Sequence, residues 1–170
     1  MLILAIPDLF GAGAGATLSG DERYRYVLWR VWNPDQPSLL WVMLNPSTAD
    51  ASDDDPTIRR CMGFSAHLGY GGLRVVNLFA WRATDPRDLG LADDPVGPDN
   101  DRHIEAEARK SGKVIVAWGS ATQGAGRDVQ VLRILRRSRR QVFALSTTST
   151  GHPGHPLYLP KSARPVLFCG

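Results

Sequence analysis

Six consecutive apolar residues, 39–44, run without a break into a short polar loop over residues 45–50. An apolar run of this length, bounded by turn residues, is typical of a buried strand. Open α/β sheets bind their ligands where such strands end. The loop therefore lies where a binding or catalytic group is expected, although its polar side chains would also suit a turn that caps the next helix.

Strands and helices are predicted to alternate along the chain. Aromatic and β-branched residues predict a strand at 24–32. Further strands are expected at residues 73–79, 113–119, 141–145 and 165–168. Helices are expected to start at the Asp55-Pro56 cap, at residue 99 or 100, and at residue 126. This alternation predicts a single α/β domain, a three-layer α/β/α sandwich with a mainly parallel central sheet.

Composition limits the class of protein. The 170 residues suit one domain, and 43% hydrophobic with 22% charged residues is ordinary for a soluble globular chain. No apolar run is long enough to span a membrane, and the first residues are not expected to form a signal peptide. Cys61 and Cys169 form neither a metal motif nor a disulfide framework, which favours the cytoplasm. Residues 11–20, rich in glycine and alanine, are expected to form a flexible loop.

The charge of the chain is mildly basic, at +3, and arginines crowd residues 127–140. This segment suits a solvated helix face, or a surface that contacts phosphates with a salt-dependent affinity. Arg136 and Arg137, with Arg59 from the first predicted helix, are the candidate nucleic-acid contacts. The acidic residues within 50–55 lack an enforced ligand spacing, so neither a metal site nor a cofactor is predicted.

Polar side chains follow several of the predicted core strands. Asn45 ends the first apolar run, Asn77 lies in the strand at 73–79, and a loop after the fourth core strand carries His152 and His155. Parallel strands aim their carboxyl ends at one edge of a sheet, so these groups are expected to line one cleft. Two imidazoles in a Gly/Pro-rich loop have little packing purpose, which favours a functional role.

Several motifs of the chain resemble those of an uncharacterised bacterial family, the domain-of-unknown-function family 1643. The similarity runs from about Arg23 to the C-terminus. The motifs are NPSTAD at 45–50, DDPTIRRC at 54–61, VNLFA at 76–80, DPVGPDND at 94–101 and GHPGHPLY at 151–158. This resemblance implies no activity, because none is established for that family.

The order of the motifs more distantly resembles the uracil-DNA glycosylase superfamily. Asn45-Pro46 is similar to its first-strand loop, Asn77 to its base-reading asparagine, and Val116-Ala117-Trp118-Gly119 to the strand before its late helix. Either His152-Pro153 or His155-Pro156 is similar to its late His-Pro loop, and both alternatives stay open. The resemblance implies a uracil-DNA-glycosylase-like fold and cleavage of an N-glycosidic bond.

The resemblance also implies roles for individual residues. Asn45 would position water, and His152 or His155 would donate a hydrogen bond to the leaving base. The wall around the base would consist of Pro46, Ser47, Phe64, Asn77 and Phe79, with Asn77 reading the base edge and a phenylalanine stacking on it. Asp50 is a candidate base, or only a cap. The alternatives are a turn for Asn45, buried backbone contacts for Asn77 and core packing for Phe64.

The leading hypothesis is a nucleobase-directed enzyme, most simply a DNA glycosylase-like hydrolase that acts on modified or damaged bases. Its partner would be DNA, or a nucleobase or nucleotide ligand. One alternative is a non-catalytic nucleic-acid or nucleotide-binding module, which the basic segment at 127–140 favours. The other is a hydrolase of small nucleotides, whose affinity for substrate would depend little on salt.

Overall fold

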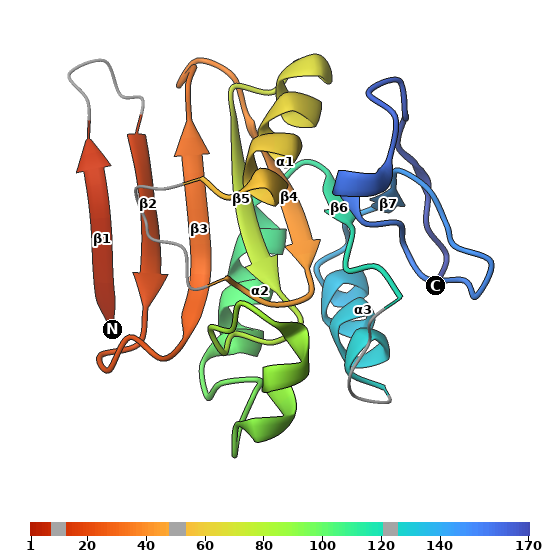
Figure 1. The fold of residues 1–170 in the computed structure, drawn as a ribbon. Helices are drawn as coiled ribbons and strands as arrows, with labels where there is room; N and C mark the ends of the chain where they lie inside the picture. The colour runs from red at the N-terminus through yellow and green to blue at the C-terminus, as the bar shows by residue number, and fades with distance from the viewer. Residues whose placement is uncertain (8–12, 48–53, 121–125) are drawn as a thin grey trace.

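A computed structural model describes residues 1–7, 13–47, 54–120 and 126–170. Within this part of the chain, eight strands form one sheet in the order β1-β2-β3-β5-β4-β6-β7-β8 (Figure 1). The strands are β1 (Leu2–Pro7), β2 (Gly13–Leu18), β3 (Arg25–Val31), β4 (Ser38–Met43), β5 (Gly72–Asn77), β6 (Val114–Val116), β7 (Val142–Ala144) and β8 (Val166–Leu167). The helices are α1 (Pro56–His67), α2 (Asn100–Lys110) and α3 (Arg127–Arg137), with short 3-10 helices η1 (Pro86–Leu91) and η2 (Pro156–Tyr158).

The expected three-layer sandwich with a mainly parallel sheet is wrong. Strand β4 pairs in parallel with β5 and β6, and β6 pairs in parallel with β7. The pairs β1–β2, β2–β3, β3–β5 and β7–β8 are all antiparallel, so the sheet is mixed and mostly antiparallel. Strand and helix alternate only from β4 to β7, which is the part of the chain that suggested a parallel sheet. The expected uracil-DNA-glycosylase-like fold belonged to that sandwich and is withdrawn with it.

The loop expected over residues 11–20 is a strand where the structure describes it, because Gly13–Leu18 forms β2. Strand β2 pairs with both β1 and β3. A Cβ atom at Gly15 would lie 2.3 Å from the carbonyl oxygen of Leu4 and 2.3 Å from the ring of Trp29. The small residues that suggested flexibility therefore allow close packing between strands.

The start of α1 follows the expectation from its cap. The side chain of Asp55 accepts a hydrogen bond from the Ile58 amide at 2.7 Å, and Pro56 occupies the first turn. An N-cap aspartate satisfies an amide that has no partner within the helix, and proline there removes one such amide. The cap fixes the point at which the chain leaves the loop after β4.

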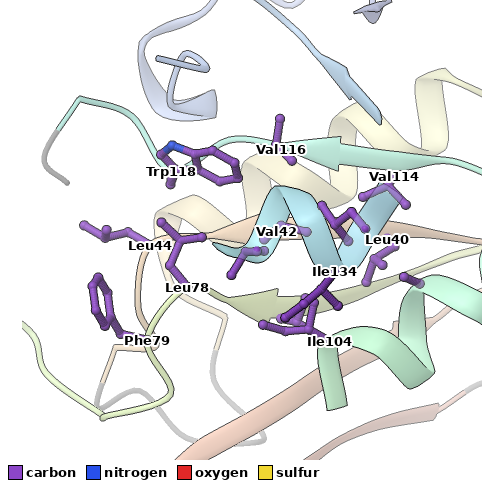
Figure 2. Packing of buried hydrophobic residues seen from close by; sticks show 14 of the residues in the cluster. Leu40, Val42, Leu44, Leu78, Phe79, Ile104, Val114, Val116, Trp118 and Ile134 are labelled. Carbon is purple, nitrogen blue, oxygen red and sulfur yellow. The ribbon is translucent and has the colours of Figure 1, made fainter. Parts of the chain in front are cut away.

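The core lies on both faces of the sheet. Leu40 and Val42 of β4 pack with α2 and α3 in one cluster (Figure 2), which also contains Ile104 and Ile134. On the other face, Trp41 packs with residues of α1 in a second cluster. Successive residues of a strand point to opposite faces, which is why an unbroken apolar run suits β4. In the described ranges, no helix is long and apolar enough to cross a membrane.

Candidate functional site

The carboxyl ends of β4 and β5 open into a pocket of about 680 Å³. Small-molecule sites occupy roughly 300–1,000 Å³, so the pocket has the size of a ligand site. Its walls also include the start of α1 and the loops that follow β6 and β7. The candidate residues that line it are Asn45, Ser47, Asn77 and His155. The structure thus brings together the polar ends of separate strands.

Asn77 ends β5 and is only 3% exposed, yet it lines the pocket. Its backbone carbonyl accepts a hydrogen bond from Asn100, but within the described ranges its side-chain amide has no hydrogen-bond partner. The fully buried side-chain atoms without a partner in the described ranges do not include those of Asn77, so its amide is accessible from the pocket. The expected alternative, an amide that satisfies buried backbone groups, does not account for this side chain. An amide in this state is a candidate for ligand recognition.

Asn45 has a divided role. Its side-chain nitrogen donates to the backbone carbonyl of Ala83 at 2.8 Å and to that of Pro46 at 3.1 Å. These bonds hold the turn, as the structural alternative predicted. The side-chain oxygen forms no hydrogen bond with any described residue and is available to a water or a ligand. Pro46 is buried and does not line the pocket, whereas Ser47 lines it and donates to Asp55 at 3.0 Å.

Of the two histidines, His155 lines the pocket and His152 does not. Burial lowers the pKa of His155 below its ordinary value of about 6.5, with an opposing effect from Asp55, so the ring is neutral at pH 7. Its Nδ1 accepts a hydrogen bond from the Leu157 amide at 3.4 Å. The proton of the neutral ring therefore lies on Nε2, and His155 can offer a hydrogen-bond donor to a ligand.

A buried cation was missed by sequence reasoning. Arg25, the first residue of β3, is only 4% exposed and lines the pocket. Burial lowers its pKa to about 10, with an opposing effect from Asp55, so it stays charged at pH 7. Two arginines inside an otherwise apolar strand, Arg25 and Arg30, were the available signal, but periodicity does not show which groups face them.

The aromatic wall of the pocket also differs from the expectation. Phe64 and Phe79, which were candidates for stacking on a base, are 3% and 4% exposed, belong to the two core clusters and do not line the pocket. Figure 2 shows Phe79 beside Leu44 and Leu78 in the core. Trp118 and Tyr158 line the pocket instead. The core interpretation of both phenylalanines accounts for their positions.

The arginines expected to contact nucleic acid lie outside the pocket lining. Arg59 is exposed and bonds to the carbonyl of Asp54, and Arg136 bonds to the carbonyl of Cys169. Arg136 and the exposed Arg137 end α3, which returns the chain between the parallel strands β6 and β7. The last turn of α3 therefore lies at the edge of the sheet where β6 and β7 begin, which is opposite the pocket. Asp50 lies outside the described residues.

Metal binding has no obvious site in the part of the chain that the structure describes. There, no three His, Cys, Asp or Glu side chains lie close enough together to hold a metal ion. Both cysteines are free, with Cys61 buried and Cys169 exposed. The polar side-chain groups of the described pocket lining are amides, hydroxyls, an imidazole, a guanidinium, a carboxylate and the indole N–H of Trp118.

Comparison with known families decides the relationship of the chain. Residues 25–157 match the family model described as protein of unknown function (DUF1643). The chain belongs to this family. The DUF1643 match starts at the first residue of β3 and ends within η2, so it contains the pocket-lining residues except Tyr158 and Leu159. Strands β1 and β2 precede the matched region, and β8 follows it.

No curated protein and no solved structure matches the chain. The distant similarity to uracil-DNA glycosylases thus rests on the short motifs alone. Any function for this DUF1643 protein has to be argued from its pocket.

Proposed function

We propose that this DUF1643 protein is a nucleobase-directed N-glycoside hydrolase, most simply one that acts on modified or damaged bases in DNA. The observation that carries the proposal is the amide of Asn77, which lines the pocket shared with Asn45 and His155 and has no hydrogen-bond partner among the described residues. A side-chain amide presents a donor and an acceptor side by side, which matches the edge of a nucleobase. Pairing with a base edge would give both polar atoms of that amide a hydrogen-bond partner.

The chemistry of the pocket fits the demands of this bond cleavage. The sugar gains positive charge as the bond to the base breaks, and the base leaves with the electron pair. The Nε2–H of His155 would donate to the developing anion, and a fixed donor at such a position is an effective form of catalysis. The free side-chain oxygen of Asn45, whose nitrogen is held by Ala83, would accept a hydrogen bond from the attacking water.

A base inside a duplex cannot reach a pocket of this kind, so the substrate would be a flipped base or a single strand. The second candidate is hydrolysis of a free nucleoside or nucleotide. The positions of Arg136 and Arg137 favour it, because neither residue lines the pocket. A weak dependence of substrate affinity on salt would distinguish the small substrate from DNA.

The experiment is a base-release assay on single- and double-stranded oligonucleotides that carry uracil, hydroxymethyluracil or other modified bases, with the matching free nucleosides as a second panel. We expect release from at least one substrate, detected by mass spectrometry. Asn77→Leu, which keeps the approximate size of the side chain, should lower kcat/KM by about 10- to 100-fold, the equivalent of losing a paired hydrogen bond. Gln36→Leu, at an exposed amide outside the pocket, is the matched control.

Three outcomes separate the hypotheses. Release that depends on Asn77 but not on Gln36 supports the hydrolase. Binding of oligonucleotides or nucleosides without release of any base would contradict the enzyme and favour the binding module. Neither release nor binding across both panels would overturn a nucleobase-directed role altogether.

A further inference from the structure

Hydrolysis needs a group that takes a proton from water, and two candidates in the pocket cannot do so. The amide of Asn45 has no basic atom. The basic atom of the neutral His155 ring is Nδ1, and it already accepts the Leu157 amide at 3.4 Å. The other nitrogen of His155 carries the proton and can only donate. The general base must therefore come from elsewhere in the pocket wall.

Asp55 carries the sole carboxylate among the described residues that line the pocket. One of its oxygens accepts the Ile58 amide at 2.7 Å, and the other accepts the Ser47 hydroxyl at 3.0 Å. An ionised carboxylate has about four lone-pair sites, so roughly half of its accepting capacity remains open. The α1 cap therefore does not exhaust what this side chain can do.

The location of Asp55 also suits a proton acceptor. Ser47 comes from the same loop as Asn45, so the bond between Ser47 and Asp55 joins the start of α1 to the loop that would hold the water. The charge of Asp55 also acts on His155 and on Arg25, which line the same pocket. An anion here would stabilise the positive charge that develops on the sugar.

We propose that Asp55 is the general base of this pocket, an inference that rests on the hydrolase proposed above. A carboxylate oxygen of Asp55 takes one proton from a water while the water oxygen bonds to the anomeric carbon. The bond from that carbon to the base nitrogen breaks, and its electron pair leaves with the base. The base anion accepts a hydrogen bond from His155 Nε2–H. Asp55 then passes its proton to solvent, from which the released base is protonated.

The test compares single-turnover base release, substrate Kd and Tm between the wild type and four variants. Asp55→Asn keeps an oxygen for the Ile58 amide and a polar group beside Ser47, but removes the base. Asp55→Ser keeps a favoured N-cap residue without a base, in case the asparagine variant folds poorly. Asp85→Asn is the matched control, since Asp85 caps η1 by accepting the Arg87 amide at 2.9 Å and lies outside the pocket lining. Asp50→Asn tests the acid that the sequence suggested.

We expect Asp55→Asn and Asp55→Ser to lower the single-turnover rate by about 10²- to 10⁴-fold, the usual contribution of general base catalysis. Their Kd values should stay within a few-fold of the wild type, so the loss falls on the rate of base release and not on substrate binding. A purely structural cap would instead change Tm and Kd together. The Asp85→Asn control should match the wild type in rate.

The outcomes separate this inference from the proposed function. Base release by the wild type that persists in both Asp55 variants, but is lost in Asp50→Asn, overturns the role of Asp55 and leaves the hydrolase standing. Release that persists in all four variants also overturns it. A wild type that releases no base from any substrate overturns the hydrolase, and the role of Asp55 with it.

Discussion

The side-chain amide of Asn100 donates hydrogen bonds to the backbone carbonyls of Asn77 and Leu78, each at 3.1 Å. The Nε of Arg127 donates to the same Leu78 carbonyl at 2.8 Å. The first residues of α2 and α3 therefore fix the backbone at the end of β5, while the Asn77 side chain lines the pocket. An amide that recognises a ligand gains from such a fixed backbone, because less freedom is lost on binding.

Replacing Asn100 with alanine should lower the free energy of unfolding by about 1–3 kcal/mol. The substitution leaves the buried carbonyl of Asn77 without its side-chain donor, and an unpaired buried carbonyl is costly. Urea denaturation followed by circular dichroism measures the change. Glu105→Ala is the control on the same helix, where loss of the exposed pair with Arg109 should cost about 0.5 kcal/mol or less. Equal losses of stability from the two substitutions would contradict the role of Asn100 in holding the end of β5.

Gly154→Ala should disturb the loop that presents His155. A Cβ atom at position 154 would lie 2.0 Å from Ser146 Oγ, and the Gly154 amide donates to the Ser146 carbonyl at 2.9 Å. Such overpacking usually costs about 1–3 kcal/mol. Thermal unfolding measures the loss of stability. Adding Ser146→Ala to the Gly154→Ala variant should restore part of that stability. The control is Gly112→Ala, where an added Cβ meets no atom within 4 Å.

The protein should lose stability as the pH falls below about 6.5. Burial lowers the pKa of both His103 and His155, with a further contribution from Arg102 for His103. Above the ordinary pKa of about 6.5, both rings are neutral in the folded and unfolded chains. Below it, the unfolded chain binds protons that the folded chain resists, so the free energy of unfolding falls until the folded pKa is passed.

Urea midpoints at pH 7.5 and pH 5.5 measure this dependence. The ring of His103 stacks on Tyr26 with the centroids 4.8 Å apart, and its Nε2 is buried without a partner among the described residues. His103→Gln should therefore make the loss of stability on acidification smaller. His67→Gln, at an exposed histidine, should leave it unchanged. An unaltered loss in His103→Gln would show that other groups govern the acid response.

One thiol should react in the folded protein and two in the unfolded protein. Cys61 is fully buried, and burial raises the pKa of its thiol, which disfavours the reactive thiolate. Cys169 is exposed. Ellman's reagent measures the number of reactive thiols before and after denaturation. In Cys169→Ser, reaction of a thiol in the native state would mean that Cys61 becomes accessible.

The local elements of the fold were predictable, but part of the sheet was not. The Asp55-Pro56 cap and the apolar run at 39–44 predicted the start of α1 and the strand β4, because these signals lie within a few residues. The antiparallel pairing of β3 with β5 joins segments far apart in the chain. Periodicity shows that a strand exists but not which strand it pairs with. The predicted parallel pairing therefore included strands that the structure shows to be antiparallel.

The site was predictable to a similar degree. Asn45, Asn77 and His155 could be singled out because polar residues stand out at the ends of apolar strands, and the structure places all three in one pocket. Phe64 resembled a stacking residue because an aromatic side chain alone does not show which face of a helix is buried. Arg25 was missed because its contacts come from tertiary packing. The functional roles of all these residues stay predictions.

The pocket walls come from nearly the whole chain, since the lining residues range from Arg25 to Leu159. No short fragment contains them, so a bound ligand would join the first and last thirds of the chain and stabilise the whole fold rather than one segment. A ligand at 100 times its Kd would add about 2.7 kcal/mol to the free energy of unfolding. Screening nucleosides and related compounds by melting temperature would therefore find ligands of this pocket without any assumption about catalysis.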